Sequence, residues 1–332
     1  MKKLKALVHA GKSGLAGLSY TTFQEVEPKS HEVRVKIKTA GLNHRDLFVI
    51  GRRNEQDSPL IIGSDGAGII DAVGERVENF KIGDEVVINP GLRWIEKTEA
   101  PPKEFEILGN PDHGTFAEKI VISSDNVELK PTYLSWEEAG VFSLAALTAY
   151  RAIFTRAGVK EGDTVFIPGI GSGVALFLLQ FAKAVNAKVY VSSRSEIKCQ
   201  KALELGADRA INSNSDWSEA LGGEKVDVVF ESIGEATFNR SLEQLRKGGT
   251  MVTFGATTGD QIEINLRNFF YGQFNLLGTT MGSATEYREM LKFMETHQIK
   301  PVIDEIFSIK EFEEAFTKMD EGKQLGKIGF CI

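Results

Sequence analysis

A glycine-rich turn is the part of the sequence best suited to hold a phosphate group. It reads Gly169-Ile170-Gly171-Ser172-Gly173 and joins an expected strand, Thr164–Ile167, to an expected helix, Leu176–Val185. Glycine lets the backbone approach a phosphate closely, and a helix N-terminus offers free N–H groups and a partial positive charge. Val174 and Ala175 complete the turn, with Ala175 at the position of a third glycine. This order predicts contact with the pyrophosphate of a dinucleotide, and a plain tight turn is the alternative interpretation.

The end of the next expected strand indicates which dinucleotide would bind. Folds that prefer NAD usually place Asp or Glu there, where the carboxylate accepts a hydrogen bond from the ribose 2′-hydroxyl. Here the strand ends Ser192-Ser193-Arg194, and Lys198 follows one helical turn later. A 2′-phosphate would repel a carboxylate and attract these cations. The residues favour NADPH, while Glu196, which also suits a helix start, is the nearest acid that could serve NAD.

Alternating strands and helices must position the turn. From residue 164 onward, apolar runs alternate with amphipathic ones, which predicts parallel strands joined by right-handed helical crossovers. Gly206 and Gly248-Gly249 are expected to end helices in left-handed conformation. The earlier part of the chain shows period-two alternation, as in residues 33–38 and 84–88, and is expected to be rich in β-strands. The expected elements are Lys188–Val191, Val226–Phe230, Thr250–Phe254 and Asn275–Gly278 as further strands, and Glu196–Leu205, Ala236–Leu245, Glu286–Thr296 and Lys310–Glu321 as further helices.

The composition of the whole chain narrows the class of protein. Its 332 residues exceed the size of most single cores, so two domains are expected. A net charge of −7 gives no basic surface for nucleic acid, and no apolar run approaches the ~18–20 residues of a membrane span. The two cysteines, Cys199 and Cys331, fit a reducing compartment. We therefore expect a cytoplasmic protein without nucleic-acid partner or integral membrane segment.

Six motifs are spread over nearly the whole chain. They are Ala40-Gly41-Leu42-Asn43-His44-Arg45-Asp46; residues 59–68 with Ala72-Val73-Gly74; Ala146-Leu147-Thr148-Ala149-Tyr150; the glycine turn; Leu205-Gly206-Ala207-Asp208; and Gly322-Lys323-Gln324-Leu325-Gly326-Lys327. Together they resemble the medium-chain dehydrogenase/reductase superfamily, and within it the zinc-free quinone oxidoreductase-like branch.

The resemblance implies an α/β protein of two domains. A GroES-like, β-rich catalytic domain would contain residues 1–131, completed by 281–332. A Rossmann domain, a doubly wound parallel sheet that binds NADPH, would contain residues 132–280. The active site would lie in the cleft between them, and the protein would be a homodimer or homotetramer.

The resemblance also bears on metal binding. Zinc-holding members bind a catalytic ion through a cysteine, the His or Glu of a Gly-His-Glu triplet, and a second cysteine. Those positions carry Asn43, Ser64-Asp65 and Leu144 here. Tetrahedral zinc needs thiolate or imidazole ligands, so no metal is expected. Segment Gly91–Gly114, an irregular stretch expected as a long surface loop, has the length of the family's second zinc lobe but no cysteine. Its role is left open between a functional loop and a tolerated insertion.

Without a Lewis acid, the hydride of the nicotinamide is best given to a quinone or an α,β-unsaturated carbonyl, because the developing negative charge is delocalised. Asn43 and Ser64 are the candidates for orienting the carbonyl or the nicotinamide and ribose, and Arg45 adds positive charge nearby. Asp46 is expected to order the loop. His44 is either a structural histidine or a group that polarises the substrate.

The proton donor is expected to be solvent. Some enoyl reductases of the superfamily place a tyrosine after the stretch that contains Asn43 and Asp46, but residues 47–57 contain none. Solvent, relayed by Ser64 or His44, would then deliver the proton.

Further cofactor contacts follow from the resemblance alone. They are Thr148, Ser232-Ile233-Gly234, Gly255-Ala256-Thr257, Thr279-Thr280-Met281 and, on the pyrophosphate, Lys327. A tyrosine common in this branch at the adenosine phosphate is Ser213 here, which puts that contact in doubt. The aromatic residues Phe269-Phe270-Tyr271 and Phe274 are expected either in the core or at the pocket or dimer seam.

Two other functions stay open. An enoyl- or acryloyl-thioester reductase would need a basic groove for the phosphates of its substrate, and none is evident in the sequence. A non-catalytic NADPH-binding protein is the second alternative, although the polar stretch from Asn43 to Asp46 argues against it, because buried polar groups cost stability.

Overall fold

The computed structural model describes residues 2–332, which form two compact units. Unit 1 contains the chain up to Ala145 together with Gly282–Ile332, and unit 2 contains Ala146–Met281. The units thus divide the chain at 145/146 and 281/282, whereas the boundaries expected from the sequence lie at 131/132 and 280/281. No helix among residues 2–332 is long and apolar enough to cross a membrane.

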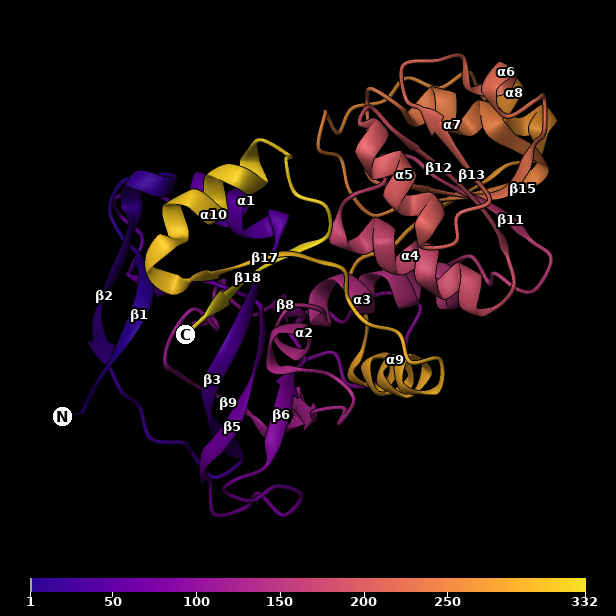
Figure 1. Cartoon of the computed structure of the whole chain (residues 1–332). Helices are drawn as coiled ribbons and strands as arrows, with labels where there is room; N and C mark the ends of the chain where they lie inside the picture. The colour runs from indigo at the N-terminus through magenta and orange to yellow at the C-terminus, as the bar shows by residue number, and fades with distance from the viewer. Residues whose placement is uncertain (1) are drawn as a thin grey trace. The chain divides into compact units, whose positions relative to one another are not determined.

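Unit 1 is built around one large β-sheet (Figure 1). Alternating apolar residues form its buried face, and Val33, Val35 and Ile37 are each at most 2% exposed. The strand order is β10 (Val127–Leu129), β6 (Glu85–Ile88), β5 (Asp65–Val73), β3 (Glu32–Leu42), β18 (Lys327–Cys331) and β17 (Ile303–Ser308), and β9 (Lys119–Ser123) also pairs with β3. A second sheet contains β2 (Leu18–Gln24), β1 (Lys3–His9) and β4 (Leu60–Ile61) in that order. The remaining elements are η1 (Leu15–Gly17), η2 (Ser124–Asn126), α2 (Trp136–Gly140), which packs on β3 and β5, and α9 (Ala284–Thr296).

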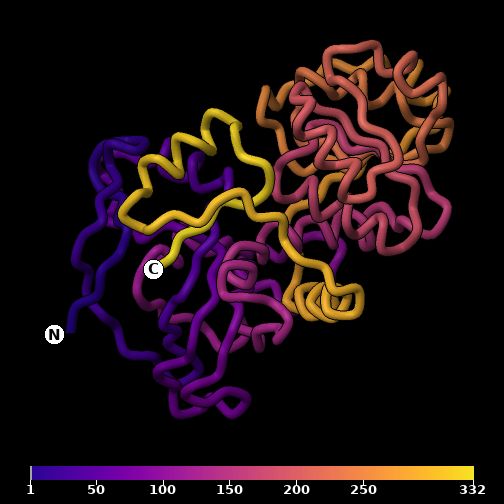
Figure 2. The backbone as a smooth tube through the Cα atoms, viewed as in Figure 1, coloured from indigo at the N-terminus to yellow at the C-terminus, as the bar shows by residue number. Residues whose placement is uncertain are grey.

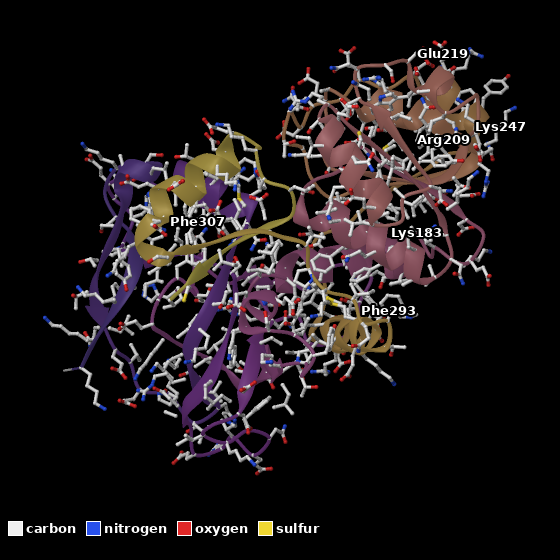
Figure 3. All side chains as sticks on the ribbon, in the orientation of Figure 1. Lys183, Arg209, Glu219, Lys247, Phe293 and Phe307 are labelled. Atoms are coloured by element: carbon white, nitrogen blue, oxygen red, sulfur yellow. The ribbon has the colours of Figure 1, made fainter. Side chains whose placement is uncertain are left out.

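The C-terminal residues complete unit 1. β18 runs antiparallel to β3, with Ile328 opposite Leu42, and Figure 2 shows this yellow segment returning among the indigo and violet strands. α10 (Phe312–Asp320), which follows η4 (Ile309–Glu311), packs against α1 (His44–Arg52). Phe307, labelled in Figure 3, lies on β17 beneath the ammonium group of Lys318 of α10. This pairing brings Lys327 next to Asn43, 284 residues away in the sequence.

The segment Gly91–Gly114 is more ordered than the expected surface loop. It contains a short ladder between β7 (Gly91–Leu92) and β8 (Glu106–Ile107). Trp94 and Leu108 are buried, at 1% and 2% exposed, and Trp94 packs edge-on against Phe105 with ring centroids 5.2 Å apart. The apolar side chains that anchor the segment are isolated in the sequence, so they form no hydrophobic periodicity from which its structure could be predicted.

Unit 2 is a parallel sheet with the strand order of a dinucleotide-binding fold. The order is β13 (Arg209–Asn212), β12 (Lys188–Ser193), β11 (Thr164–Ile167), β14 (Val226–Glu231), β15 (Leu245–Thr253) and β16 (Asn275–Gly278). Numbered from β11, this is the order 3-2-1-4-5-6 that characterises the Rossmann fold. The helices are α3 (Ser143–Tyr150), which begins in unit 1 and continues as the π-helix η3 (Arg151–Arg156), then α4 (Gly173–Ala184), α5 (Glu196–Glu204), α6 (Trp217–Ala220), α7 (Phe238–Gln244) and α8 (Leu266–Gly272). The fold class predicted from the sequence, GroES-like plus Rossmann, is confirmed.

Local predictions differ in outcome for physical reasons. Strands Thr164–Ile167 and Asn275–Gly278 are found as predicted, and Gly206 follows α5 with φ +100°. The prediction that Gly248-Gly249 ends a helix is wrong: α7 ends at Gln244, and Gly248, with φ +74°, lies in an irregular part of β15. β13, α6 and α8 were not predicted, because they are short and flanked by polar residues.

Candidate active site

The glycine turn of unit 2 adopts backbone angles that favour glycine. Gly169 has φ +71° and Gly171 has φ +133°. A Cβ atom on Gly171 would lie 2.8 Å from Cδ of Lys198, and one on Gly169 would lie 2.8 Å from Cδ1 of Ile233. The turn therefore lies directly against the segments that follow β12 and β14.

The start of α4 presents amide groups at this turn. Ser172 is the N-cap, and its Oγ accepts a hydrogen bond from Ala175 N at 3.3 Å. The first residues of a helix, here Gly173 and Val174, have no acceptor within the helix for their N–H groups. These two amides and the positive end of the helix dipole suit an anion.

The end of β12 lies next to the turn, because Ile170 N donates to Ser192 O at 2.8 Å. Ser192 and Ser193 are buried, and their Oγ atoms accept hydrogen bonds from Ser213 Oγ at 3.0 Å and from Ser195 N at 3.1 Å. Ser213 is thus tied to Ser192. Arg194 is exposed, and Lys198 is half-buried with its chain against Gly171.

The ends of β14 and β15 form the other side of the same sheet edge. Ser232 O would lie 2.8 Å from a Cβ on Gly255, and Ile233 O accepts from Thr258 N at 2.8 Å, so the stretches after both strands, including Ala256 and Thr257, lie together. The turn after β14 is organised by Glu231, which is fully buried. Its carboxylate accepts hydrogen bonds from Ile233 N, Gly234 N, Thr237 Oγ1 and Ser241 Oγ. The sequence predictions missed Glu231, although an acid that ends an apolar strand is a visible signal.

Thr148 and Met281, each predicted from the resemblance as a cofactor contact, lie close to each other in unit 2. Thr148 Oγ1 is 3.8 Å from Met281 Sδ, and Met281 has φ +43°. Thr280 is exposed, whereas Oγ1 of Thr279 is buried with no hydrogen-bond partner among the described residues. An unpartnered buried hydroxyl is what a polar ligand group would satisfy.

A buried polar cluster in unit 1 contains Asn43, Asp65 and Lys327, which are 6%, 0% and 4% exposed. The Lys327 ammonium donates to Asn43 Oδ1, to Leu42 O at 3.1 Å and to Asp65 Oδ2 at 3.2 Å. Asn43 Nδ2 donates to Asp65 Oδ2 at 3.0 Å, and the other carboxylate oxygen accepts from Leu144 N at 2.7 Å. Lys327, expected on the pyrophosphate, has acceptors within unit 1 for all three of its N–H groups.

A second set of contacts joins Arg45 and Ser64 to the segment that follows β8. Arg45 Nη1 donates to Ser64 Oγ at 3.0 Å and to Leu108 O at 2.9 Å. Ser64 is fully buried, and its hydroxyl donates to the same carbonyl at 2.8 Å. Segment Gly91–Gly114 therefore holds Ser64 in place, and the hydroxyl proton of Ser64 is already used.

Asp46 orders the start of α1, as expected. Its Oδ2 accepts from Asn43 N at 2.8 Å, which satisfies an amide at the helix N-terminus. The carboxyl is 1% exposed, and Oδ1 has no hydrogen-bond partner among the described residues. Burial raises the pKa of Asp46 to about 6, although Arg45 and the hydrogen bond from Asn43 oppose the rise.

Two other groups complete the description of unit 1. His44 is exposed at the first turn of α1, and its ring packs edge-on against Phe48 with centroids 5.0 Å apart. Ser143 and Tyr287, which the sequence predictions missed, form a buried pair with oxygens 2.7 Å apart. Burial raises the pKa of Tyr287 well above its ordinary value, so its hydroxyl stays protonated. Tyr287 reaches Ser143 from α9, and no local motif marks that contact.

Comparison with known proteins fits this arrangement. Residues 29–132 match the alcohol dehydrogenase GroES-like domain family, and residues 173–296 match the zinc-binding dehydrogenase family. A zinc-type alcohol dehydrogenase-like protein of Schizosaccharomyces pombe is 34% identical, over 98% of this chain and 98% of that protein. The chain belongs to the medium-chain dehydrogenase/reductase superfamily.

Other members of the superfamily show its range. Quinone oxidoreductase of Salmonella typhimurium is 29% identical over 75% of this chain and 72% of its own. Acryloyl-coenzyme A reductase of Sulfurisphaera tokodaii is 27% identical over 98% of this chain and 99% of its own. The crystal structure of an NAD-dependent alcohol dehydrogenase matches with a TM-score of 0.92 and 33% identity, over 99% of both chains. The chain is therefore an oxidoreductase of the superfamily, as the sequence motifs predict.

The residues at the superfamily's catalytic zinc position do not fit that ion. The positions that the resemblance assigns to its ligands carry Asn43, Ser64-Asp65 and Leu144, and the Lys327 ammonium already donates to both the amide oxygen of Asn43 and the carboxylate of Asp65. Residues 2–332 contain no group of three or more His, Cys, Asp or Glu side chains that could hold a metal ion. The thiolate and imidazole ligands on which zinc sites in proteins are chiefly built are missing from this donor set.

Proposed function

We propose that this protein is an NADPH-dependent reductase that gives hydride to a quinone or an α,β-unsaturated carbonyl without a zinc ion. The observation that supports the proposal is the cluster around Asn43. This residue, at the position that the resemblance gives to a zinc-binding cysteine, accepts a hydrogen bond from Lys327, which also donates to Asp65. A simple ketone needs a strong electrophile to stabilise the alkoxide that forms. A conjugated acceptor spreads its developing charge, so a hydrogen-bond donor is enough.

The choice of NADPH rests on the stretch after β12. β12 ends without a carboxylate. The exposed Arg194 follows it directly, and the side chain of Lys198 lies against Gly171. Both cations can reach a phosphate group on the ribose, and buried Ser193 keeps its hydroxyl proton for donation while accepting from Ser195 N. NAD would lack the phosphate that these cations favour.

The residues of unit 1 have different roles in the proposed reaction. Asn43 Nδ2 has one strong hydrogen bond, to Asp65, and only a 3.5 Å contact to Gly41 O with its other hydrogen. That second N–H is the donor that Asn43 can give to the acceptor carbonyl or the nicotinamide. Ser64 serves through its position, because its hydroxyl donates to Leu108 O, and Arg45 serves through its charge, with Nη1 donating to the same carbonyl. His44, exposed at the start of α1, is the group that can relay a proton from solvent.

Reduction of an enoyl thioester is a second candidate, favoured by the likeness to acryloyl-coenzyme A reductase over nearly the whole of both chains. The chemistry is the same conjugate addition of hydride, so the two functions differ only in the group attached to the unsaturated carbonyl, and that group stays in the product. Such a substrate carries phosphates and would show it in a steep dependence of KM on ionic strength.

Association of two chains is also proposed, through the edge of the unit 2 sheet. β16 is an edge strand, and exposed apolar side chains surround it on that strand and on α8. They are Leu266, Phe270, Tyr271 and Leu276, each more than 40% exposed. An open edge with apolar neighbours is a surface for strand pairing. Light scattering should give the mass of a dimer or tetramer, and a monomer at micromolar concentration would refute this association.

The test of function is NADPH and NADH oxidation with a panel of quinones, alkenals and enoyl-coenzyme A esters. We expect turnover of a quinone or alkenal, faster with NADPH. No turnover of any acceptor, with NADPH still bound at micromolar affinity, would favour a protein that only binds the dinucleotide.

A further inference from the structure

Among the residues that the structure describes, the Lys327 ammonium is the one positive charge with a hydrogen bond to Asn43, and it is fixed from three sides. It donates to Asn43 Oδ1, Asp65 Oδ2 and Leu42 O, and its side chain is 4% exposed. A lysine with three acceptors and almost no exposure has little freedom to move. In the sequence, Lys327 was expected on the cofactor pyrophosphate, and its contacts in unit 1 suggest a different task.

The two charges decide how the carboxamide of Asn43 is oriented. Its oxygen faces the ammonium group, and its nitrogen faces the carboxylate of Asp65 at 3.0 Å. If the amide were turned over, N–H groups would face the ammonium group and the oxygen would face the carboxylate. Both contacts would then be repulsive inside a buried cluster, where charges are weakly screened.

We propose that Lys327, paired with Asp65, is a positioning residue that locks and polarises Asn43 for the reaction. An ammonium group on Oδ1 draws electron density from the amide and makes its N–H groups stronger donors, because linked hydrogen bonds reinforce one another. The N–H that has only the 3.5 Å contact to Gly41 O is then aimed and strengthened for an acceptor oxygen. This inference rests on the proposed function, since it assigns the donor of that same site.

The backbone supports the cluster from both sides. Gly41 is close enough that an added Cβ would lie 2.7 Å from Cα of Val141 and 3.0 Å from Cβ of Asp65. The amide of Leu144 fixes the other oxygen of Asp65 at 2.7 Å. Asp65 therefore cannot turn away from Lys327 and Asn43 without losing a buried hydrogen bond.

The test is a double-mutant cycle with Lys327→Met and Asn43→Ala. We expect Asn43→Ala to lower kcat for a quinone about 10²-fold and Lys327→Met to lower it at least about tenfold. The double variant should be no slower than Asn43→Ala, because Lys327 acts through Asn43. The Kd of NADPH, measured by fluorescence quenching, should stay within about twofold of the wild-type value, and Lys327→Arg should restore part of kcat. Lys323→Met is the matched control, an exposed lysine near the end of the chain that should change nothing.

Two results would overturn the proposal. If Lys327 and Asn43 acted independently, the loss of kcat in the double variant would equal the product of the two single-variant losses. A phosphate ligand would appear as a Kd for NADPH raised at least about tenfold by Lys327→Met with kcat kept. If Lys327→Met does not fold, the cycle is run with Lys327→Gln, which keeps a polar group beside Asp65 but removes the positive charge from Asn43 Oδ1.

Failure of the proposed function has a separate signature. If the wild-type protein oxidises NADPH with no acceptor of the panel, the same cycle is measured by thermal unfolding. If the Tm shift of the double variant is smaller than the sum of the two single-variant shifts, Lys327 and Asn43 interact. The positioning contact would then stand, although the proposed function would be refuted. Additive shifts would overturn the positioning role as well.

Discussion

The two regions that carry the candidate site use their polar groups in opposite ways. In unit 2, the glycine turn and the start of α4 present backbone amides of Gly173 and Val174 that the helix itself cannot satisfy. In unit 1, the side chains of Asn43, Asp65 and Lys327 satisfy one another. The first region leaves donors open for a charged ligand, and the second holds one amide in a fixed orientation. The proposed function assigns binding and chemistry to different units, so variants can separate them.

Gly171→Ala should show the largest effect on the binding region. The position has φ +133°, and a Cβ would lie 2.8 Å from Cδ of Lys198. We expect the affinity for NADPH to fall about 10²-fold, as for one or two lost hydrogen bonds to a charged phosphate. Fluorescence titration measures it. Gly223→Ala is the control, with φ +75° and open space around its Cβ, and an equal loss of affinity there would point to general strain instead.

Asp46→Asn tests the chemical region through its stability. The carboxyl pKa is about 6 in the folded protein and 3.8 in the unfolded chain, so the folded state holds its proton more tightly. The contribution of this raised pKa to the free energy of unfolding is at its full value below pH 4, and it is lost as the pH rises through 6. The loss amounts to about 3 kcal/mol. An asparagine side chain cannot titrate, so Asp46→Asn does not lose this contribution. The free energy of unfolding of the variant minus that of wild type should therefore increase between pH 4 and 7.

Urea unfolding at several pH values measures this difference. Asp260→Asn, an exposed acid of unit 2, is the control and should show a flat difference. A flat difference for Asp46→Asn as well would mean that the buried carboxyl is ionised throughout, and the description of the cluster would be wrong.

Arg194→Ala should have the smallest effect and should act on binding alone. Arg194 is exposed, and an exposed ion pair contributes about 1 kcal/mol, so NADPH should bind about fivefold more weakly while NADH is unaffected. Lys198→Ala should act in the same direction. Lys201→Ala, on the same helix, is the control. Equal losses for both coenzymes would remove the 2′-phosphate assignment.

The same comparison explains how much the sequence could foretell. Phosphate binding by backbone amides needs glycines at fixed spacing between a strand and a helix, and that is a local pattern, visible at residues 169–173. The cluster in unit 1 is made by side chains from distant parts of the chain. Asn43 and Lys327 are 284 residues apart, and only the pairing of β18 with β3 joins them. Both residues were singled out from the motifs of the superfamily, but their contact with each other was not predicted.

Segment Gly91–Gly114 illustrates the same limit. The sequence shows that the segment contains no cysteine, but it does not show that the carbonyl of Leu108 accepts hydrogen bonds from Ser64 and Arg45. A backbone carbonyl carries no residue type, so no motif can reveal what it binds. The buried Ser143–Tyr287 pair was missed for the related reason that its members lie on different elements, 144 residues apart.

The most direct test of the account is NADPH oxidation by the purified protein before and after dialysis against a strong chelator, with zinc content measured in both samples. Turnover of a 1,4-benzoquinone that survives dialysis unchanged, at a zinc content far below one ion per chain, is the result expected if the Asn43 cluster works without metal. Turnover that disappears with the chelator and returns with added zinc would contradict the account.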